Sequence, residues 1–418
     1  MKTIFRIAQT ELRLFFYSPI AWLILIIFAF QAGMAFCDTF SYQLQNKALG
    51  RGQIPFQTVI LLLGDSGSFF KVLNNLYLYI PLLTMALMSR EYSSGSIKLL
   101  YSSPVTNFQI IGGKFLAMML YGGLMLVILL LQVVFAFIFV KNLDIPLILS
   151  GLLGIYLVLC AYSAIGLFMS TLTSYQIVAA VGTLAILAAL TYVQGMWQAV
   201  PFVREITYWF GLSGRAWAFV GGLVSSEDVL YFVVVIALFI CMTIIRMQSR
   251  RRKVSWTVSF SKYAGIWIVA FVLAYVSSRP VFKFYYDATQ MKVNTLTPNS
   301  QEIIKRLDGG LTITTYVNIL DRFAWVGDHE NYISDRSAFE QYIRFKPEIK
   351  MKYVYYYDTI QNNFLENMYP GMSYEEKAKK EIERKKLNPK KVLNPEQIRA
   401  QIDLVSTEGN RTTRLLER

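Results

Sequence analysis

Seven long apolar runs constrain this chain more than any other feature of its sequence. They lie at about 19–37, 69–89, 115–140, 146–170, 175–196, 228–246 and 262–279. Each is close to the ~20 residues that an α-helix needs to cross the hydrocarbon core of a bilayer. Because the bilayer interior offers no water to unpaired backbone groups, such runs must fold as helices. We therefore expect an α-helical polytopic membrane protein, with a six-span bundle and a seventh span.

The composition and the placement of charge agree with this class. Of the 418 residues, 55% are hydrophobic and only 16% are charged, which is outside the usual range of soluble domains. Residues 1–280 hold 19 Lys and Arg against 8 Asp and Glu, whereas the remainder holds 22 against 19. The basic excess thus belongs to the membrane part. A nucleic-acid-binding protein needs a concentrated basic face on a folded domain, so we expect no nucleic-acid partner.

The basic residues also predict the orientation of the chain. If the N-terminus is cytoplasmic, the inside-facing segments carry twelve Lys and Arg and the outside loops before the seventh span carry six. Basic residues concentrate on the cytoplasmic side of membrane proteins. This predicts a cytoplasmic N-terminus, and an odd number of spans then places residues 280–418 outside the cytoplasm.

Residues 1–18 have the pattern of an amphipathic helix. Apolar side chains recur at helical spacing, at Ile4, Ile7, Ala8, Leu12, Phe15 and Phe16. Lys2, Arg6 and Arg13 lie on the other side, and Ser18-Pro19 turns the chain. The pattern favours an elbow helix lying in the membrane interface. The alternative is a simple extension of the first span.

The apolar runs contain no Asp, Glu, Lys or Arg away from their ends. Ion-coupled carriers usually keep such groups inside the helix bundle, so this absence counts against a secondary transporter. The notable polar residues within the runs are Gln31, Gln132 and Gln194. We expect inter-helix hydrogen bonds from them, in preference to contacts with a substrate.

A short polar connection, Met88–Lys114, joins the second and third runs. Gly95 breaks the preceding helix, and Ile97–Tyr101 forms a compact amphipathic turn. Pro104 prevents that turn from continuing, because it lacks an N–H group and restricts the residue before it. Thr106 or Asn107 then caps the next helix.

The residues of this connection resemble the first cytoplasmic loop of ABC-2-type transporter permeases. The order is Glu91, Gly95-Ser96, Leu99-Leu100, Ser103-Pro104-Val105 and Gly113-Lys114. Ser96 stands where the family usually has Thr, and it keeps the hydroxyl. The resemblance implies a homodimer and a coupling helix that sits in a groove of a separate cytoplasmic ABC ATPase subunit. It would make that contact through Glu91, as a charged partner, and through Gly95, Ser96, Ile97, Leu99, Leu100 and Pro104.

An aromatic and glycine-rich stretch, Ala199–Leu230, lies between the fifth and sixth runs. Its apolar pieces are too short to span a bilayer, so we expect paired re-entrant or interfacial helices. The tail Gly222–Phe232 again resembles ABC-2 permeases, in which a similar pattern leads into the last span. The permease-like part then closes at residue 246. The expected outer gate consists of Tyr208, Trp209, Trp217, Gly221 and Asp228.

The rest of the chain has a different character. Residues 247–261 form a basic cytoplasmic linker, which we expect to act as an anchor against anionic lipid. After the seventh span, residues 280–418 predict an α/β domain. We expect a helix capped by Asn299 or Ser300, strands at 311–317 and 349–356, and a helix at 334–345 between them. The charged segment 373–418 predicts helices without further strands.

The start of this domain resembles the auxiliary membrane subunit found beside gliding-motility ABC permeases in Bacteroidota. The resemblance rests on Leu296-Thr-x-Asn-Ser300, a helix, Leu307-Asp308 and a strand. It implies a permease fused to a periplasmic auxiliary domain in a bacterial inner membrane, with a role in motility or secretion. Because the family's domain is larger and precedes another span, we expect an incomplete or shortened version here.

Catalytic motifs are missing from the sequence. The closest approach to a phosphate-binding loop, Gly112-Gly113-Lys114-Phe115, lacks both the loop length and the hydroxyl. We therefore expect no enzyme activity, cofactor or metal in this chain, and ATP and Mg²⁺ would belong to the partner ATPase. Two functions stay open. One is substrate export driven by that ATPase, and the other is transmission of force or signal to a periplasmic protein partner without solute transport.

Overall fold

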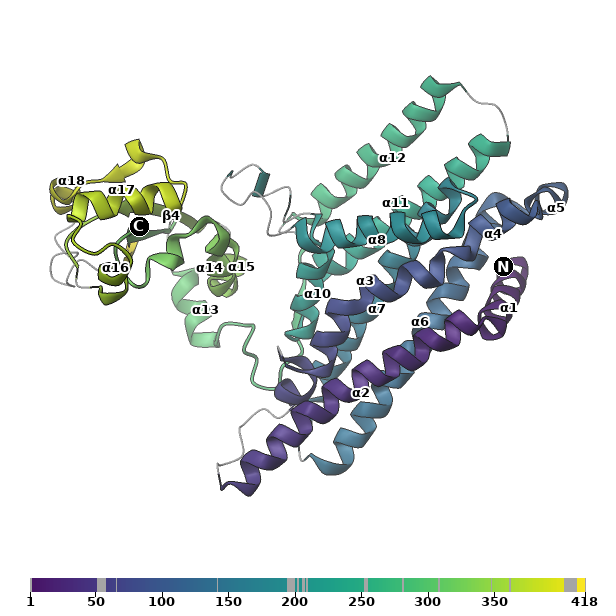
Figure 1. The fold of residues 1–418 in the computed structure, drawn as a ribbon, viewed down its shortest axis with the longest axis horizontal. Helices are drawn as coiled ribbons and strands as arrows, with labels where there is room; N and C mark the ends of the chain where they lie inside the picture. The colour runs from purple at the N-terminus through teal and green to yellow at the C-terminus, as the bar shows by residue number, and fades with distance from the viewer. Residues whose placement is uncertain are drawn as a thin grey trace. The chain divides into compact units, whose positions relative to one another are not determined.

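The computed structural model describes residues 2–417 except 51–57, 65, 141, 194–199, 201–202, 205–206, 208–209, 252–254, 280–281, 307–308, 347, 361 and 402–411. The chain divides into two compact units (Figure 1). Unit 1 contains residues 1–194 and 207–293, and unit 2 contains residues 195–206 and 294–418.

Unit 1 is built from helices that follow the predicted apolar runs. They are α1 (Lys2–Tyr17), α2 (Pro19–Ala48), η1 (Val59–Leu63), α3 (Ser68–Thr84), α4 (Ala86–Ser94), α5 (Ile97–Ser102), α6 (Asn107–Phe139), α7 (Ile145–Leu172), α8 (Gln176–Tyr192), α10 (Leu212–Val220), α11 (Ser226–Arg251) and α12 (Trp256–Ser277). Within the described residues, six helical stretches are long and apolar enough to cross a membrane. The fifth predicted run forms α8, whose 17 residues lie at the lower limit for a span.

Helix α7 lies at the centre of unit 1. Its most apolar stretch is 67% buried, compared with 22% for α6 and α11 and 6% for α12. Small residues allow the close packing, because a Cβ atom on Gly166 would lie 2.1 Å from Thr84 Oγ1 of α3. Helix α12 is therefore peripheral and packs mainly on α11.

Helix α1 is a separate element at one end of unit 1. It ends at Tyr17, and α2 begins at Pro19, a residue suited to the first helical turn. The Trp22 indole N–H donates to the Phe16 carbonyl at 2.8 Å across this elbow. The predicted helix at 1–18 is thus present, and its location at a membrane surface stays a prediction.

The opposite end of unit 1 carries a two-stranded ribbon. Strand β1 (Leu223–Ser225) precedes α11, strand β2 (Tyr285–Asp287) follows α12, and the two strands pair antiparallel. They meet because α11 and α12 lie side by side as a helical hairpin (Figure 1). The start of α11 and the end of α12 are therefore close together. Unit 1 therefore continues to Val293, past the predicted domain boundary at residue 280. We call residues 282–293 the strap.

Unit 2 contains a four-stranded mixed sheet in the order β5-β4-β3-β6. Strands β3 (Thr312–Asn318) and β4 (Lys350–Tyr356) are parallel and lie close to the predicted ranges. The expectation that 373–418 lacks strands is wrong, since β5 (Val392–Leu393) pairs with β4 and β6 (Thr413–Glu417) pairs with β3. Both are short segments that pairing with the core strands holds extended, a context that local propensity does not report.

The described part of unit 2 also contains short helices, which include the 3-10 helices η4 (Ala324–Gly327), η5 (His329–Asn331) and η6 (Pro389–Lys391) and six α-helices. The α-helices are α13 (Pro298–Lys305), α14 (Tyr332–Ala338), α15 (Glu340–Phe345), α16 (Asn363–Met368), α17 (Tyr374–Arg384) and α18 (Pro395–Gln401). The cap of α13 is Thr297, not Asn299 or Ser300 as predicted. Pro298 explains the difference, because proline favours the first helical position and excludes the residue before it from the helix.

Candidate functional site

The polar connection between α3 and α6 is positioned by a helix break. Pro81 lies inside α3, and the helix ends at Thr84 before α4 begins. Ser170 of α7 satisfies the backbone groups at the break. Its Oγ accepts from the N–H groups of Met88 and Ser89 at 2.9 and 3.0 Å and donates to the Met85 carbonyl at 3.0 Å. The central helix thereby sets the direction of α4.

Helices α4 and α5 form a tight hairpin (residues 86–102), turned by Gly95. Its φ of +75° is in the left-handed region, and a Cβ atom there would meet nothing within 4 Å. Glycine is therefore required by the backbone and not by crowding. Helix α5 ends before Pro104, and Thr106 caps α6 in a capping box with Gln109. The predicted break is confirmed, and Thr106 rather than Asn107 is the cap.

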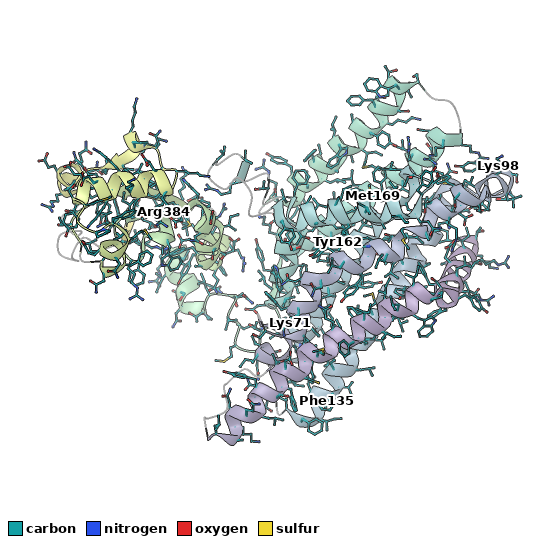
Figure 2. The ribbon with its side chains drawn as sticks, in the orientation of Figure 1. Lys71, Lys98, Phe135, Tyr162, Met169 and Arg384 are labelled. Carbon is teal, nitrogen blue, oxygen red and sulfur yellow. The ribbon has the colours of Figure 1, made fainter. Side chains whose placement is uncertain are left out.

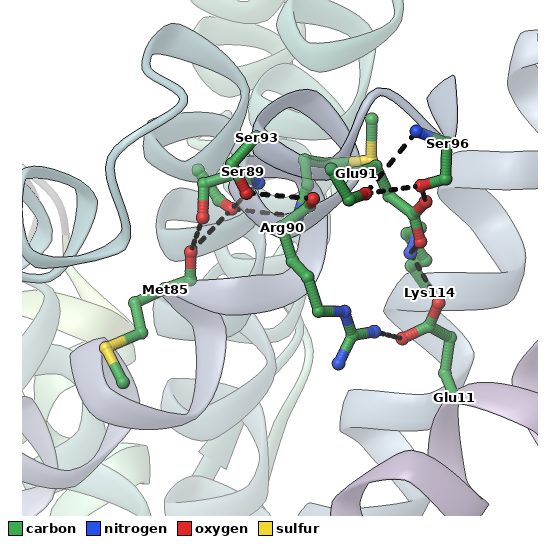
Figure 3. Close-up of polar contacts among 11 residues, drawn as sticks. Glu11, Met85, Ser89, Arg90, Glu91, Ser93, Ser96 and Lys114 are labelled. Atoms are coloured by element: carbon green, nitrogen blue, oxygen red, sulfur yellow. Dashed lines mark hydrogen bonds and ion pairs between the residues drawn. The ribbon is translucent and has the colours of Figure 1, made fainter. Parts of the chain in front are cut away.

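A buried ion cluster fixes the base of this hairpin (Figure 3). It consists of Glu11 from α1, Arg90 and Glu91 from α4, and Lys114 from α6. The Lys114 ammonium pairs with Glu11 and lies 3.3 Å from Glu91 Oε1, while an Arg90 guanidinium nitrogen lies 3.4 Å from Glu11 Oε2.

The charges of the cluster cancel, two acids against two bases, and the Ser96 hydroxyl donates to Glu91. Buried ion pairs are tolerated only when their remaining hydrogen-bonding capacity is also satisfied, and Ser96 contributes here. The hydroxyl at this position therefore has a structural use. The cluster joins three elements that are distant in sequence.

Gly113 and Lys114 act together in binding α1. A Cβ atom on Gly113 would lie 2.7 Å from the Ile7 side chain and 3.0 Å from the Ile4 carbonyl oxygen. The missing side chain therefore lets α1 lie against α6, and the Lys114 side chain then reaches Glu11. This is a physical reason for the adjacent Gly-Lys pair.

Nothing in the predicted site pointed to Glu11. The signal is nevertheless present in the sequence, because Glu11 is the only acid of α1 and falls on the stripe Ile4–Ala8–Glu11–Phe15 that faces α6. The residue is only 6% exposed. A lone carboxylate on an apolar helix face predicts a buried cation opposite it.

The predicted contact residues of the hairpin point in different directions. Ile97 is buried, whereas Leu99 is 74% exposed. It follows Lys98, which Figure 2 labels at the tip of the hairpin. Pro104 is exposed, and Leu100 packs partly against the core. We expected Glu91 to be a charged contact for a partner, but its carboxylate is already paired within the chain.

The basic segment after the sixth predicted span also contacts the hairpin. Arg250 lies over the Tyr92 ring at 4.2 Å and donates to the Leu172 carbonyl at 2.8 Å. Arg251 donates to the Tyr101 carbonyl at 2.8 Å. An anchoring role alone therefore does not describe these arginines. Burial raises the pKa of the Tyr101 hydroxyl above its ordinary value.

The residues predicted as an outer gate lie at the other end of unit 1. The Trp217 ring of α10 contacts the Phe70 ring in a tilted arrangement, with 4.1 Å between the ring centroids, and Gly221 follows the last residue of α10. Asp228, in the first turn of α11, pairs with Arg215 at 2.7 Å. Tyr208 and Trp209 lie outside the described residues. Of the predicted pair of short helices, α10 is one, and the other falls largely outside the described residues.

Arg215 was not predicted as part of this end, although its position two residues before Trp217 marks it as a cation in an apolar segment. Its side chain is 8% exposed, and its guanidinium also lies over the Tyr231 ring at 4.3 Å. Ser225 Oγ donates to Asp228 at 2.5 Å. Lys283 of the strap pairs with Glu227 at 2.6 Å, so the strap joins the same polar group.

The glutamines within the apolar runs differ. Gln31 accepts a hydrogen bond from the Tyr79 hydroxyl, which links α2 to α3 as predicted. Gln132 Oε1 is buried and has no hydrogen-bond partner among the described residues. Gln194 lies outside them.

The hairpin, the ion cluster and the helices that hold them fall within one region of sequence similarity. Residues 5–203 match the family of ABC-2 family transporter proteins. No curated protein and no solved structure matches the chain. The match covers just under half of the chain and makes this region similar to ABC-2 permeases. Together with the apolar helices among the described residues, it supports a multi-pass membrane protein. ABC-2 permeases normally work with a cytoplasmic ABC ATPase.

Proposed function

We propose that this chain is the permease subunit of an ABC exporter-like complex in a bacterial inner membrane. Its N-terminus lies in the cytoplasm and its C-terminal α/β unit in the periplasm, and two copies form the complex. A separate ATPase binds ATP and Mg²⁺ and docks on the α4–α5 hairpin. The observation that carries this proposal is the hairpin itself, an exposed apolar tip on a base fixed by the buried ion cluster.

The contacts of the hairpin suggest how a movement of the ATPase would be transmitted to the helices of unit 1. The ion cluster holds α4 to α1 and α6, and Ser170 holds it to α7. A displacement of the tip would therefore move these helices together. In this proposal Leu99 contacts the ATPase, and Gly95 provides the turn that presents it. Glu91 is a positioning residue, because it acts through Lys114 and Ser96.

Co-purification tests the docking surface. The full chain is expressed with its candidate ATPase and purified in mild detergent, as the parent and as Leu99→Asp and Leu49→Asp variants. Both leucines are exposed, Leu99 at 74% and Leu49 at 68%. Leu49 is the control because it follows the C-terminal end of α2 and is not part of the hairpin. We expect Leu99→Asp to reduce ATPase recovery at least tenfold and Leu49→Asp to leave it unchanged. Equal recovery with both variants would refute docking at this hairpin.

A second candidate function is transmission of force or signal to a periplasmic partner, in motility or secretion, without solute transport. The strap favours it, since β2 ends at Asp287 and the larger segment of unit 2 begins at Asn294. Movement at the start of α11 would therefore reach unit 2 through few residues. Protease sensitivity of unit 2 in proteoliposomes, with and without ATP, measures such transmission. As a control, Val224→Cys and Tyr286→Cys together would allow a disulfide across the ribbon, where the two residues face each other. That disulfide would hold β1 and β2 in place.

A further inference from the structure

Helix α1 presents a polar stripe of three cations and one amide on its exposed side. Lys2, Arg6, Gln9 and Arg13 follow one another at three- or four-residue spacing, and all are exposed. The only acid of the helix, Glu11, is buried on the opposite side and paired with Lys114. The carboxylate that would otherwise neutralise the stripe is thus withdrawn from the surface, and the exposed charge of α1 is wholly positive.

A groove runs beside the first half of this stripe. It has a volume of about 580 Å³, and its lining is Lys2, Ile4, Phe5, Arg6, Gln9 and Leu116. The lining combines two cations and an amide with apolar side chains, and it contains no carboxylate. Phe5 is 61% exposed, so its ring is free to contact a hydrocarbon chain, and that contact would remove apolar surface from water.

We propose that this groove binds an anionic phospholipid from the leaflet in which α1 lies. Lys2 and Arg6 hold the headgroup phosphate through charge-assisted hydrogen bonds, and Phe5 and Leu116 contact the beginning of an acyl chain. Three observations select this ligand: the uncompensated positive charge, the apolar remainder of the lining, and the place of α1 just before the first predicted span. A zwitterionic lipid lacks the net negative charge that the two cations favour.

The site has a consequence for the hairpin. Because Glu11 joins α1 to Lys114 and Arg90, a lipid held on α1 stabilises the base of the hairpin from the membrane side. This inference depends on a membrane location and not on the identity of the ATPase. Its failure and the failure of the proposed function are therefore distinguishable.

The test measures lipid retention by native mass spectrometry of the full chain in detergent. The probes are phosphatidylglycerol and phosphatidylcholine of equal chain length. The matched variants are Arg6→Gln and Arg13→Gln, because each removes one charge from the same stripe but only Arg6 lines the groove. We expect Arg6→Gln to lower phosphatidylglycerol occupancy about fivefold, and Arg13→Gln to change it less than twofold. Lys2→Gln should repeat the loss.

Three results would overturn the proposal. Equal losses in the Arg6 and Arg13 variants would show diffuse electrostatic attraction without a site. Equal retention of the two lipids would remove the headgroup selectivity. Displacement of phosphatidylglycerol by an equal concentration of soluble glycerol phosphate would show a phosphate site that makes no use of the acyl chain.

Discussion

Unit 1 has a buried ionic centre at each end, and the two centres join different kinds of element. At the hairpin end, Glu11 and Lys114 are 103 positions apart in sequence, and their cluster brings together α1, α4 and α6. At the strap end, Arg215 and Asp228 are only 13 positions apart and belong to consecutive helices. The first centre joins elements that are distant in sequence, whereas the second links consecutive helices and adds one contact to the strap, through Lys283 and Glu227.

The two ends also differ in what they leave exposed. The hairpin end projects Leu99 beyond its ionic centre. The strap end is covered, because β2 pairs with β1 and the Gln290 N–H donates to Asp144 at 2.7 Å. The family match includes the first centre and not the second. We infer that the hairpin end is arranged to engage a partner as one body, and the strap end to secure the connection to unit 2.

The largest expected effect comes from removing Lys114, the buried cation of the hairpin end. Lys114→Met leaves the buried Glu11 and the partly buried Glu91 with Arg90 as their remaining counterion, so we expect a loss of about 4 kcal/mol in the free energy of unfolding. Chemical unfolding in detergent micelles measures this. The control is Lys98→Met, an exposed site with an expected change within about 0.5 kcal/mol. Similar stability of the two variants would mean that the cluster does not hold the hairpin.

A glycine at the strap end should give the next largest effect. Gly222 has φ of +86°, and a Cβ atom would lie 2.6 Å from Leu147 Cδ1 and 2.7 Å from Thr289 Cγ2. Gly222→Ala therefore combines backbone strain with crowding, and we expect a loss of about 3 kcal/mol. The same unfolding assay applies. If Gly222→Ala lowers the free energy of unfolding by less than Gly95→Ala does, the strap is not packed closely against Gly222.

Removing the cation of the strap end should cost less than removing Lys114. In Arg215→Met, Asp228 keeps its hydrogen bond from Ser225, and Glu227 keeps Lys283. We expect a loss of about 2 kcal/mol, measured beside Arg13→Met as an exposed control. If Arg215→Met proves as damaging as Lys114→Met, the contrast between a long-range and a local centre fails.

The smallest stability effect is expected at the hairpin turn. Gly95 shares the left-handed backbone of Gly222 but has no neighbour within 4 Å of a Cβ atom, so Gly95→Ala should cost only about 1 kcal/mol. Gly95→Asn should cost less, because asparagine tolerates this conformation better. ATPase co-purification is the second measurement. A stable Gly95→Ala variant that loses the ATPase would indicate that the turn geometry matters for docking.

Much of the secondary structure could be predicted because its signals are local. Apolar runs of sufficient length place helices wherever the backbone must satisfy its own hydrogen bonds. Gly95 and Pro104 end helices through their own backbone geometry, and alternation over 311–317 is enough to indicate β3. The resemblance of residues 91–114 to a family loop likewise depends on a short, continuous stretch.

Tertiary structure decided which of these elements meet. Whether Glu11 is solvated or buried depends on α6. Lys114 reaches the Glu11 carboxylate only because Gly113 has no side chain to keep α1 away from α6. The roles of Arg250 and Arg251 depend in the same way on Tyr92 and Tyr101. Strands β5 and β6 are extended because β4 and β3 pair with them. Local periodicity determined the helices of this protein, but the partners of its buried charges were selected by packing between segments that no local pattern connects.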